Sequence, residues 1–333
     1  MMKYDVYAIG NALVDIEYHA EESKLNELSI EKGLMTLIDE TKQNSLIRHL
    51  GDSHESMACG GSAANTIIAI AQMGGKTHFD CRVANDITGQ FFADDLKQSG
   101  VYSKIDISSA PVGVTGKCLV FVTPDADRTM NTFLGVCTDL DHSDIDHDAI
   151  AHSQYAYIEG YLVTNDCTRE AAIKVRRIAE DRKVKTALTL SDPNMVLYFR
   201  EGLEAMIGDG VDLLFANEDE AFELAQTKDL DETVYALKKI AKTFAITRGK
   251  QGALVFDGEK TIEIVPHPVN AIDTLGAGDM FAGAFLYGLT QGMSYQEAGD
   301  LASLASSKIV TQYGPRLKAS QTQALLTGFN TGN

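Results

Sequence analysis

Residues 270–281 read Asn-Ala-Ile-Asp-Thr-Leu-Gly-Ala-Gly-Asp-Met-Phe, and this segment is the most informative part of the sequence. Gly276, Ala277 and Gly278 carry no bulky side chain where a loop is expected to open into a helix, so the backbone can approach a ligand closely. The N–H groups at the start of a helix bind anions, and the helix dipole adds partial positive charge. The segment therefore predicts an anion site, with Asp279 beside it in the first helical turn.

The overall charge of the chain makes such a local anion site necessary. The 333 residues include 29 basic and 47 acidic side chains, and the formal net charge is −18. An acidic surface repels nucleic acid and anionic membranes, so neither is an expected partner. It also repels a polyphosphate such as ATP, so an ATP site has to be built locally from backbone N–H groups or a few cations.

The carboxylate of Asp279 would be well placed to take part in phosphoryl transfer. A carboxylate beside a transferring phosphate can accept the proton of an attacking hydroxyl group. The alternative is that Gly-Ala-Gly only packs a helix against a strand, with Asp279 as a helix cap. The complete heptad from Asp273 to Asp279 favours the chemical interpretation over the packing one.

Short β-branched or aromatic runs alternate with helical patterns along the chain. Such alternation predicts an α/β fold, with a mostly parallel sheet and helices on both of its faces. The expected strands are residues 4–9, 155–158, 186–190, 212–215, 243–247 and 253–256, and the expected helices are residues 63–73, 89–98, 169–182, 218–224, 232–242, 277–289 and 295–311.

Two stretches depart from this alternation and predict a small second sheet. Residues 13–18 and 35–38 read as strands, with no helix expected before residue 40. Residues 114–122 and 128–133 flank Thr-Pro-Asp-Ala-Asp, which is typical of a turn, so we expect a β-hairpin. Together these strands would form a lid from about residues 12–38 and 112–135, within a single domain spanning residues 1–333.

Four motifs together resemble one protein family. Asp273–Asp279 is similar to the D-T-x-G-A-G-D signature of the ribokinase (phosphofructokinase B, PfkB) family of carbohydrate and nucleoside kinases. Gly60–Asn65 resembles its G-G-x-x-x-N signature, Asn217–Glu220 its N-x-x-E motif, and Thr247–Gly249 its T-x-G segment. The motifs occur in the family's order over almost the whole chain. The resemblance implies a three-layer αβα sandwich with a β-sheet lid, and ATP-dependent phosphorylation of a primary hydroxyl.

The resemblance also implies roles for residues on the ATP side. Asp279 would be the catalytic base, and Gly276, Ala277 and Gly278 would form the anion hole for the γ-phosphoryl group. Asn217 and Glu220 would hold Mg²⁺ largely through water, although alone they would read as a helix start. The implied nucleotide contacts are Thr247, Gly249 and Thr274, and the implied K⁺ site consists of the backbone carbonyls of Asp273 and Leu275.

On the acceptor side, Gly60, Gly61 and Asn65 fall where the family binds its substrate, although a tight turn before a surface helix would also fit them. Residues 10–15, Gly-Asn-Ala-Leu-Val-Asp, resemble the G-N-x-L-x-D segment of adenosine kinases, which implies that Asn11 and Asp15 contact ribose hydroxyls. The alternative for Asp15 is an aspartate that only closes the first strand.

Arg128, in the expected hairpin, resembles the lid arginine that adenosine kinases bring over the phosphates. A solvated hairpin arginine is the other interpretation. The sequence thus favours phosphorylation of the 5′-OH of adenosine, although residues 312–315, Gln-Tyr-Gly-Pro, depart from eukaryotic adenosine kinases. Inosine, guanosine, ribose, fructose and 2-keto-3-deoxygluconate stay open as acceptors. A nucleoside or sugar sensor without catalysis is the alternative of a different class.

The remaining sequence features bear on the setting of the protein. Five widely spaced cysteines without a C-x-x-C motif predict reduced thiols. A strand expected to begin near Tyr4 argues against a signal peptide, and no apolar run reaches the roughly 18 residues of a membrane span. We therefore expect a cytoplasmic protein. Open edges of the lid could pair with a second chain, so both a monomer and a homodimer formed through the lid stay open.

Overall fold

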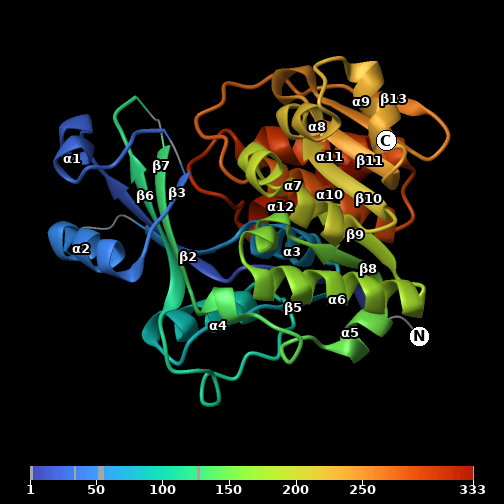
Figure 1. Ribbon diagram of the computed structural model, residues 1–333. Helices are drawn as coiled ribbons and strands as arrows, with labels where there is room; N and C mark the ends of the chain where they lie inside the picture. The colour runs from blue at the N-terminus through green and yellow to red at the C-terminus, as the bar shows by residue number, and fades with distance from the viewer. Residues whose placement is uncertain (1–2, 34, 52–55, 126–127, 333) are drawn as a thin grey trace.

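The computed structural model describes residues 3–33, 35–51, 56–125 and 128–332. Its larger sheet runs through the right-hand part of Figure 1. The strands of this sheet are β1 (Tyr4–Ile9), β5 (Thr77–Asp80), β8 (Ser153–Ile158), β9 (Lys185–Thr189), β10 (Val211–Asn217), β11 (Ala241–Thr247), β12 (Ala253–Phe256) and β13 (Thr261–Ile264). Their order in the sheet is β13-β12-β11-β10-β9-β8-β1-β5. The neighbouring strands between β11 and β5 in this order pair in parallel, whereas β12 pairs antiparallel with both β11 and β13.

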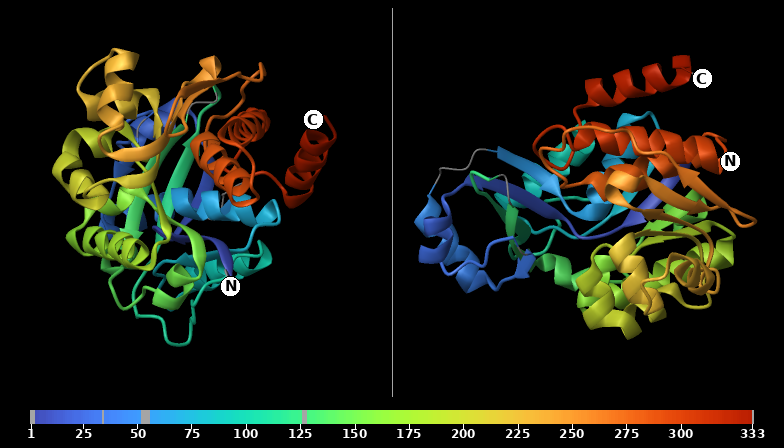
Figure 2. Two further views of the ribbon diagram at one scale, coloured as in Figure 1. Left: turned by 90° about the vertical axis from the view of Figure 1, so that its right-hand side faces the viewer. Right: turned by 90° about the horizontal axis from the view of Figure 1, so that it is seen from above.

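Helices cover both faces of this sheet (Figures 1 and 2). One apolar cluster joins the sheet to α3 (Ser62–Gln72), α10 (Ala277–Thr290) and α11 (Tyr295–Ile309), and α12 (Ala319–Gly332) lies outside them. A second cluster joins it to α5 (His147–Ala151), α6 (Asp166–Arg182), α7 (Pro193–Ile207), α8 (Glu218–Ala225) and α9 (Leu230–Leu237). Strands buried on both faces read as continuous apolar runs, which is why the sequence marked them. The expected three-layer αβα sandwich is confirmed.

Several helix boundaries follow from capping groups. Ser294 and Glu297 form a capping box at the start of α11, and Asp192 caps α7, which has Pro193 in its first turn. In this part of the fold, the sequence pattern did not predict α5, α7, α12, β5 or β13. The expected helix at residues 232–242 was too long, because α9 ends at Leu237 and residues 241–247 form the strand β11 between β10 and β12.

The smaller sheet lies on the left in Figure 1 and forms the lid. Its order is β3-β7-β6-β2-β4, made of β3 (Met35–Leu37), β7 (Arg128–Gly135), β6 (Thr115–Val122), β2 (Leu13–His19) and β4 (Ser56–Gly60). The expected hairpin strands pair antiparallel, while Ala126 and Asp127 of the expected turn lie outside the described residues. β4 was not expected, and it pairs with β2.

Two helices cover one face of the lid sheet. They are α1 (Glu22–Glu27) and α2 (Glu40–Leu50), and their buried Leu25 and Leu46 belong to the same apolar cluster as Tyr18 and Phe121. The sequence predicted no helix between residues 13–18 and 35–38, and this prediction was wrong because α1 lies between β2 and β3. The short polar segment at residues 22–27 gave little apolar periodicity, and it is held by packing on the lid. The uncovered face of the lid sheet looks toward the larger sheet.

Candidate active site

A cavity of about 670 Å³ lies between the lid and the carboxyl ends of the parallel strands. Ligands of open α/β sheets bind at this edge, because loops from neighbouring strands converge there. Five parallel strands each bring a polar residue to the cavity wall at their carboxyl end. These residues are Asn11 after β1, Glu159 after β8, Thr189 at the end of β9, Asn217 at the end of β10 and Thr247 at the end of β11. Most of the predicted site residues therefore meet in one place, although they are spread over the whole sequence.

The predicted anion-binding loop leads into α10 at this cavity. Gly276 is the N-cap, and its φ of +73° lies in the left-handed region that favours glycine. A Cβ atom at Gly276 would overlap the carbonyl oxygen of Pro315, so the loop also requires glycine for space. Apart from its chain neighbours and the backbone of its own helix, a Cβ atom at Gly278 would meet no described atom within 4 Å, and Gly278 lines the cavity. Thr274 also lines the cavity, whereas Ala277 does not.

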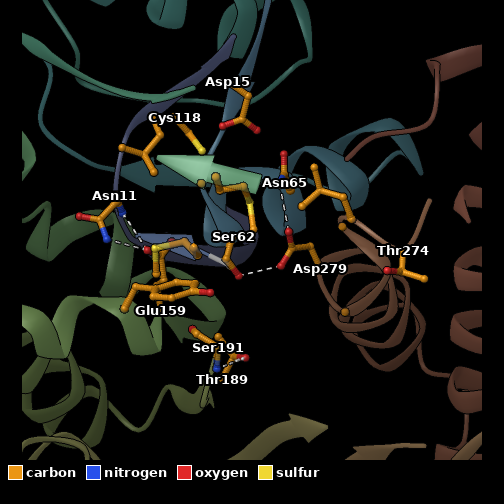
Figure 3. Close-up of a pocket in the computed structure, with 18 of the residues that line it drawn as sticks. Asn11, Asp15, Ser62, Asn65, Cys118, Glu159, Thr189, Ser191, Thr274 and Asp279 are labelled. Atoms are coloured by element: carbon orange, nitrogen blue, oxygen red, sulfur yellow. Dashed lines mark hydrogen bonds between the residues drawn. The ribbon is translucent and has the colours of Figure 1, made fainter. Parts of the chain in front are cut away.

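Asp279 is the third residue of α10, and both of its carboxylate oxygens accept a hydrogen bond (Figure 3). Ser62 donates to Oδ1 at 2.7 Å and Asn65 donates through Nδ2 to Oδ2 at 3.0 Å. Burial raises the pKa of Asp279 to about 6, while these two bonds act to lower it. The carboxylate is thus ionised at neutral pH and is a stronger base than an ordinary aspartate.

Glu159 is a site residue that the sequence analysis missed. It follows β8, is only 1% exposed, and accepts hydrogen bonds from Asn11 Nδ2 (2.8 Å), the Asn11 backbone N–H (3.3 Å) and the Ala63 N–H (2.8 Å). Burial raises its pKa to about 7. It thereby joins two predicted acceptor segments (Figure 3). An acidic residue directly after a buried strand was the available signal, because a buried carboxylate needs partners.

The paired glycines serve the acceptor side in different ways. Gly60 does not line the cavity, but a Cβ atom there would overlap the carboxylate of Asp15. Gly61 lines the cavity with a φ of +94°, and a Cβ atom there would overlap the backbone oxygen of Asn11. Burial raises the pKa of Asp15 to about 7, with the nearby Arg316 acting against this shift. The glycines therefore make room for Asn11 and Asp15, the two residues expected to contact the ribose.

Asn217 and Glu220 form a reciprocal capping box at the start of α8. Glu220 is 4% exposed, and Asn217 donates to its Oε1 from Nδ2 (2.7 Å) and to its Oε2 from the backbone (2.9 Å). Burial raises the pKa of Glu220 to about 7. Both residues also line the cavity, so the helix-start and ligand-binding interpretations apply together. Thr247 lines the cavity too, whereas Gly249, which begins the 3-10 turn after it, is not one of the lining residues.

Arg128 lies on the cavity wall and connects the lid to the anion-binding loop. Its Nη2 is 2.7 Å from Oδ2 of Asp273 and 3.2 Å from Oε2 of Glu17. Asp273 also accepts hydrogen bonds from the backbone N–H groups of Gly314 (2.8 Å) and Leu275 (3.0 Å). Arg128 is therefore not a solvated hairpin residue, because its charged group is held at the junction of three segments.

Comparisons with known proteins agree with this geometry. The pfkB family of carbohydrate kinases matches residues 34–322, which is most of the chain. The chain belongs to the pfkB family. Two solved structures are each 35% identical to this chain and superpose on it with a TM-score of 0.89. One is an adenosine kinase from Sinorhizobium meliloti, and the match covers 98% of this chain and 99% of that one. The other is a probable sugar kinase from Rhizobium etli CFN 42, and the match covers 99% of this chain and 100% of that one. An adenosine kinase of Saccharomyces cerevisiae is 25% identical over 94% of this chain and 97% of the yeast protein.

As a member of the pfkB family, the protein is an ATP-dependent kinase that phosphorylates a hydroxyl group of a small molecule. The geometry suits this activity, because the predicted anion-binding helix start and the predicted carboxylate base share one cavity with the predicted acceptor residues. In the described part of the chain, no helix is both long and apolar enough to cross a bilayer.

The cavity carries on its wall oxygen donors of the kind that Mg²⁺ prefers. Its described wall carries the acidic residues Asp15, Glu159, Glu220, Asp273 and Asp279, against Arg128 as the cationic side chain. ATP alone would meet strong repulsion there, and Mg²⁺ is a hard cation that prefers such oxygen ligands and retains water. Asn217 and Glu220 therefore fit a Mg²⁺ held through water, which would neutralise phosphate charge during transfer.

Proposed function

We propose that the protein transfers the γ-phosphoryl group of ATP to the 5′-OH of adenosine and forms AMP. The observation that carries this choice is the apolar wall that the lid presents to the cavity, formed by Leu13, Met35, Met130 and Leu134, with Cys118 beside them. A purine has two apolar faces that would be buried against such a surface, whereas a free sugar would lose hydration around most of its hydroxyls. The similarity to adenosine kinases supports the same choice.

In the proposed reaction, each part of the cavity has one task. Asn11, Asp15, Gly61 and Asn65 bind the ribose and direct the 5′-OH toward the phosphate. Asp279 takes the proton of this hydroxyl as its oxygen attacks in line. The backbone N–H groups from Gly276 to Gly278 stabilise the charge of the transferring group. The lid excludes water and so favours transfer over hydrolysis of ATP.

Arg128 has a proposed catalytic role at the junction of the lid and the loop. Its ion pair with Asp273 places a guanidinium group next to the loop that receives the γ-phosphate. A cation at this position stabilises the negative charge that the phosphoryl group carries in the transition state. We further propose that the nucleotide contacts Thr247, Gly249 and Thr274, and that K⁺ binds the backbone carbonyls of Asp273 and Leu275.

Withdrawal of the divalent cation should abolish turnover. With excess chelator, we expect ADP formation from ATP and adenosine to fall at least ~100-fold, because the acidic wall would face an unneutralised polyphosphate. A coupled assay measures the rate, and added Mg²⁺ should restore it. The same assay in Na⁺ and in K⁺ tests the proposed monovalent site. Full activity in chelator would contradict the role of Asn217 and Glu220.

The acceptor is tested by measuring ADP release across adenosine, inosine, guanosine, ribose, fructose and 2-keto-3-deoxygluconate. We expect kcat/KM for adenosine to exceed that for each free sugar by at least ~100-fold, since the sugars leave the apolar lid surface unused. The similarity to a probable sugar kinase favours a sugar as the second candidate. Turnover on a sugar alone would retain the kinase and reject adenosine. Binding of ATP without turnover on any acceptor would favour a sensor.

We also propose that residues 1–333 form one catalytic domain and that the protein acts in the cytoplasm, as a monomer or as a homodimer formed through the lid. The cavity draws its wall from both sheets, so neither sheet has a complete site alone. The helices α1 and α2 already cover one face of the lid sheet, which leaves its edge strands β3 and β4 for any pairing with a second chain.

A further inference from the structure

We propose that Ser62 is a positioning residue, whose hydroxyl holds the carboxylate of Asp279 in the orientation that takes the proton from the acceptor. This proposal rests on the proposed role of Asp279 as the base. Ser62 falls at a variable position of the G-G-x-x-x-N motif, so the motif assigns it no role. Its assignment comes from the structure, in which the two residues are 217 positions apart in the chain and 2.7 Å apart at Oγ and Oδ1.

The hydroxyl of Ser62 is not used to start its own helix. Ser62 is the first residue of α3, whose N-cap is Gly61 and has no side-chain capping bond. Serine near a helix start usually bonds to the backbone of the same turn. In the described part of the chain, the side chain of Ser62 donates instead to Asp279 on α10. The bond therefore serves the site and not the local fold.

The packing of α3 on α10 gives this bond a fixed geometry. A Cβ atom at Gly283 of α10 would lie 2.8 Å from the backbone oxygen of Thr66 and 2.9 Å from Cβ of Ala69. The two helices therefore approach each other too closely for any larger residue. A donor on the first turn of α3 and an acceptor on the first turn of α10 are thus held by rigid elements, which position side chains more accurately than loops do.

Ser62 and Asn65 divide the work at Asp279. They lie three residues apart on one face of α3 and each donates to a different carboxylate oxygen, so rotation of the carboxylate is restrained (Figure 3). Asn65 also lines the cavity and is proposed above to bind the ribose, and its buried Oδ1 has no hydrogen-bond partner in the described chain. Replacement of Asn65 would therefore disturb both the base and the proposed ribose contact. Ser62 lines the cavity too, but its hydroxyl donates to Asp279, so the pH profile of a Ser62 variant is the more direct test of the base.

The two donors also favour the ionised form of Asp279 against its surroundings. Acidic and phenolic groups from several elements interact electrostatically with Asp279. They are Asp15 on β2, Tyr157 on β8, Glu159 after β8, Tyr161 before α6 and Glu220 on α8. The cationic side chain on the described cavity wall is Arg128 of the lid. Burial already raises the pKa of Asp279 to about 6. Loss of the Ser62 bond would remove a stabiliser of the charged form and raise this pKa further.

The test compares Ser62→Ala with Ser62→Thr, which keeps a hydroxyl group. The kcat/KM for the acceptor is measured from pH 5 to pH 9 at saturating Mg²⁺–ATP, and each variant is divided by wild type at the same pH, so that titrations shared by both proteins cancel. For Ser62→Ala, we expect the acid limb to move up by about one pH unit, which makes the ratio about fivefold lower at pH 6 than at pH 8. Ser62→Thr should follow wild type.

The outcomes separate this inference from the proposed function. A pH-independent ratio for Ser62→Ala, with Asp279→Asn inactive, would overturn the role of Ser62 and leave the base in place. Wild-type turnover by Asp279→Asn would overturn the base itself. An upward shift of the acid limb that Ser62→Thr restores would support the inference, because a loss of packing or stability would not move the pH profile.

Discussion

Replacement of Asp279 by asparagine is expected to lower kcat by about 10³-fold, within the usual range for loss of a general base. Asparagine keeps the size of the side chain, but one of the two accepting oxygens becomes an N–H₂ donor, so the hydroxyl of Ser62 or the amide of Asn65 has to turn and accept. The change removes the negative charge and the capacity to accept a proton. We expect the Kd for ATP to stay within about threefold, because the backbone N–H groups of the anion-binding loop are unchanged. Single-turnover kinetics and calorimetric titration with ATP measure the two quantities.

The stability of this variant provides the control. The folded-state pKa of Asp279 is raised from 3.8 to about 6, so the burial favours the protonated form. The favourable contribution is complete below pH 3.8 and is lost as the pH rises through about 6. At pH 8 the wild-type protein therefore keeps an ionised carboxylate in a buried position that disfavours charge. The Asp279→Asn variant, with a neutral side chain there, should be at least as stable as the wild-type protein. A lower Tm for the variant at pH 8 would contradict this account of Asp279.

The parts of this site that the sequence predicted share a local cause. The loop of residues 273–279 combines a left-handed glycine, an open glycine and an acidic third helical residue within one turn, so its geometry follows from neighbouring residues. The Asn217–Glu220 pair is likewise a contact over three positions. Central strands were recognisable because burial on both faces imposes a continuous apolar run. These features depend on short-range chemistry that a single sequence displays.

The missed features depend on contacts that only the complete fold creates. Glu159 meets Asn11 across 148 positions, and Ser62 meets Asp279 across 217. The local sequence shows Glu159 only as an acidic residue directly after a buried strand, and it shows Ser62 as an ordinary helix serine. The helix α1 is also short and polar, and it exists because the lid sheet offers an apolar face to Leu25. A sequence pattern cannot carry such information, because the partner lies in another element.

Replacement of Gly276 by alanine should impair both the fold and the catalysis. The backbone at Gly276 has a φ of +73°, which costs an L-residue roughly 1–2 kcal/mol, and the added Cβ atom would overlap the carbonyl oxygen of Pro315. Either the loop or the segment that contains Pro315 must then move. We expect the free energy of unfolding to fall by about 2–4 kcal/mol and kcat to fall by about 100-fold, since the anion-binding N–H groups would lose their alignment. Urea denaturation and steady-state kinetics measure these changes.

Gly278→Ala is the matched control, because the same methyl group is added two residues later in the same loop. Apart from its chain neighbours and the backbone of its own helix, its Cβ atom would meet no described atom within 4 Å. Alanine is also favoured over glycine inside a helix by about 0.5–1 kcal/mol. The stability of this variant should therefore equal or exceed that of wild type. The methyl group would enter the open side of the loop, where the phosphates approach, so the KM for ATP should rise. If both variants showed the same stability and the same turnover, the left-handed glycine would not be what shapes the anion hole. We expect the Gly276 variant to lose stability and the Gly278 variant to lose affinity for ATP. This difference follows from the neighbours of the two glycines, because Gly276 packs against Pro315 and Gly278 faces the open side of the loop.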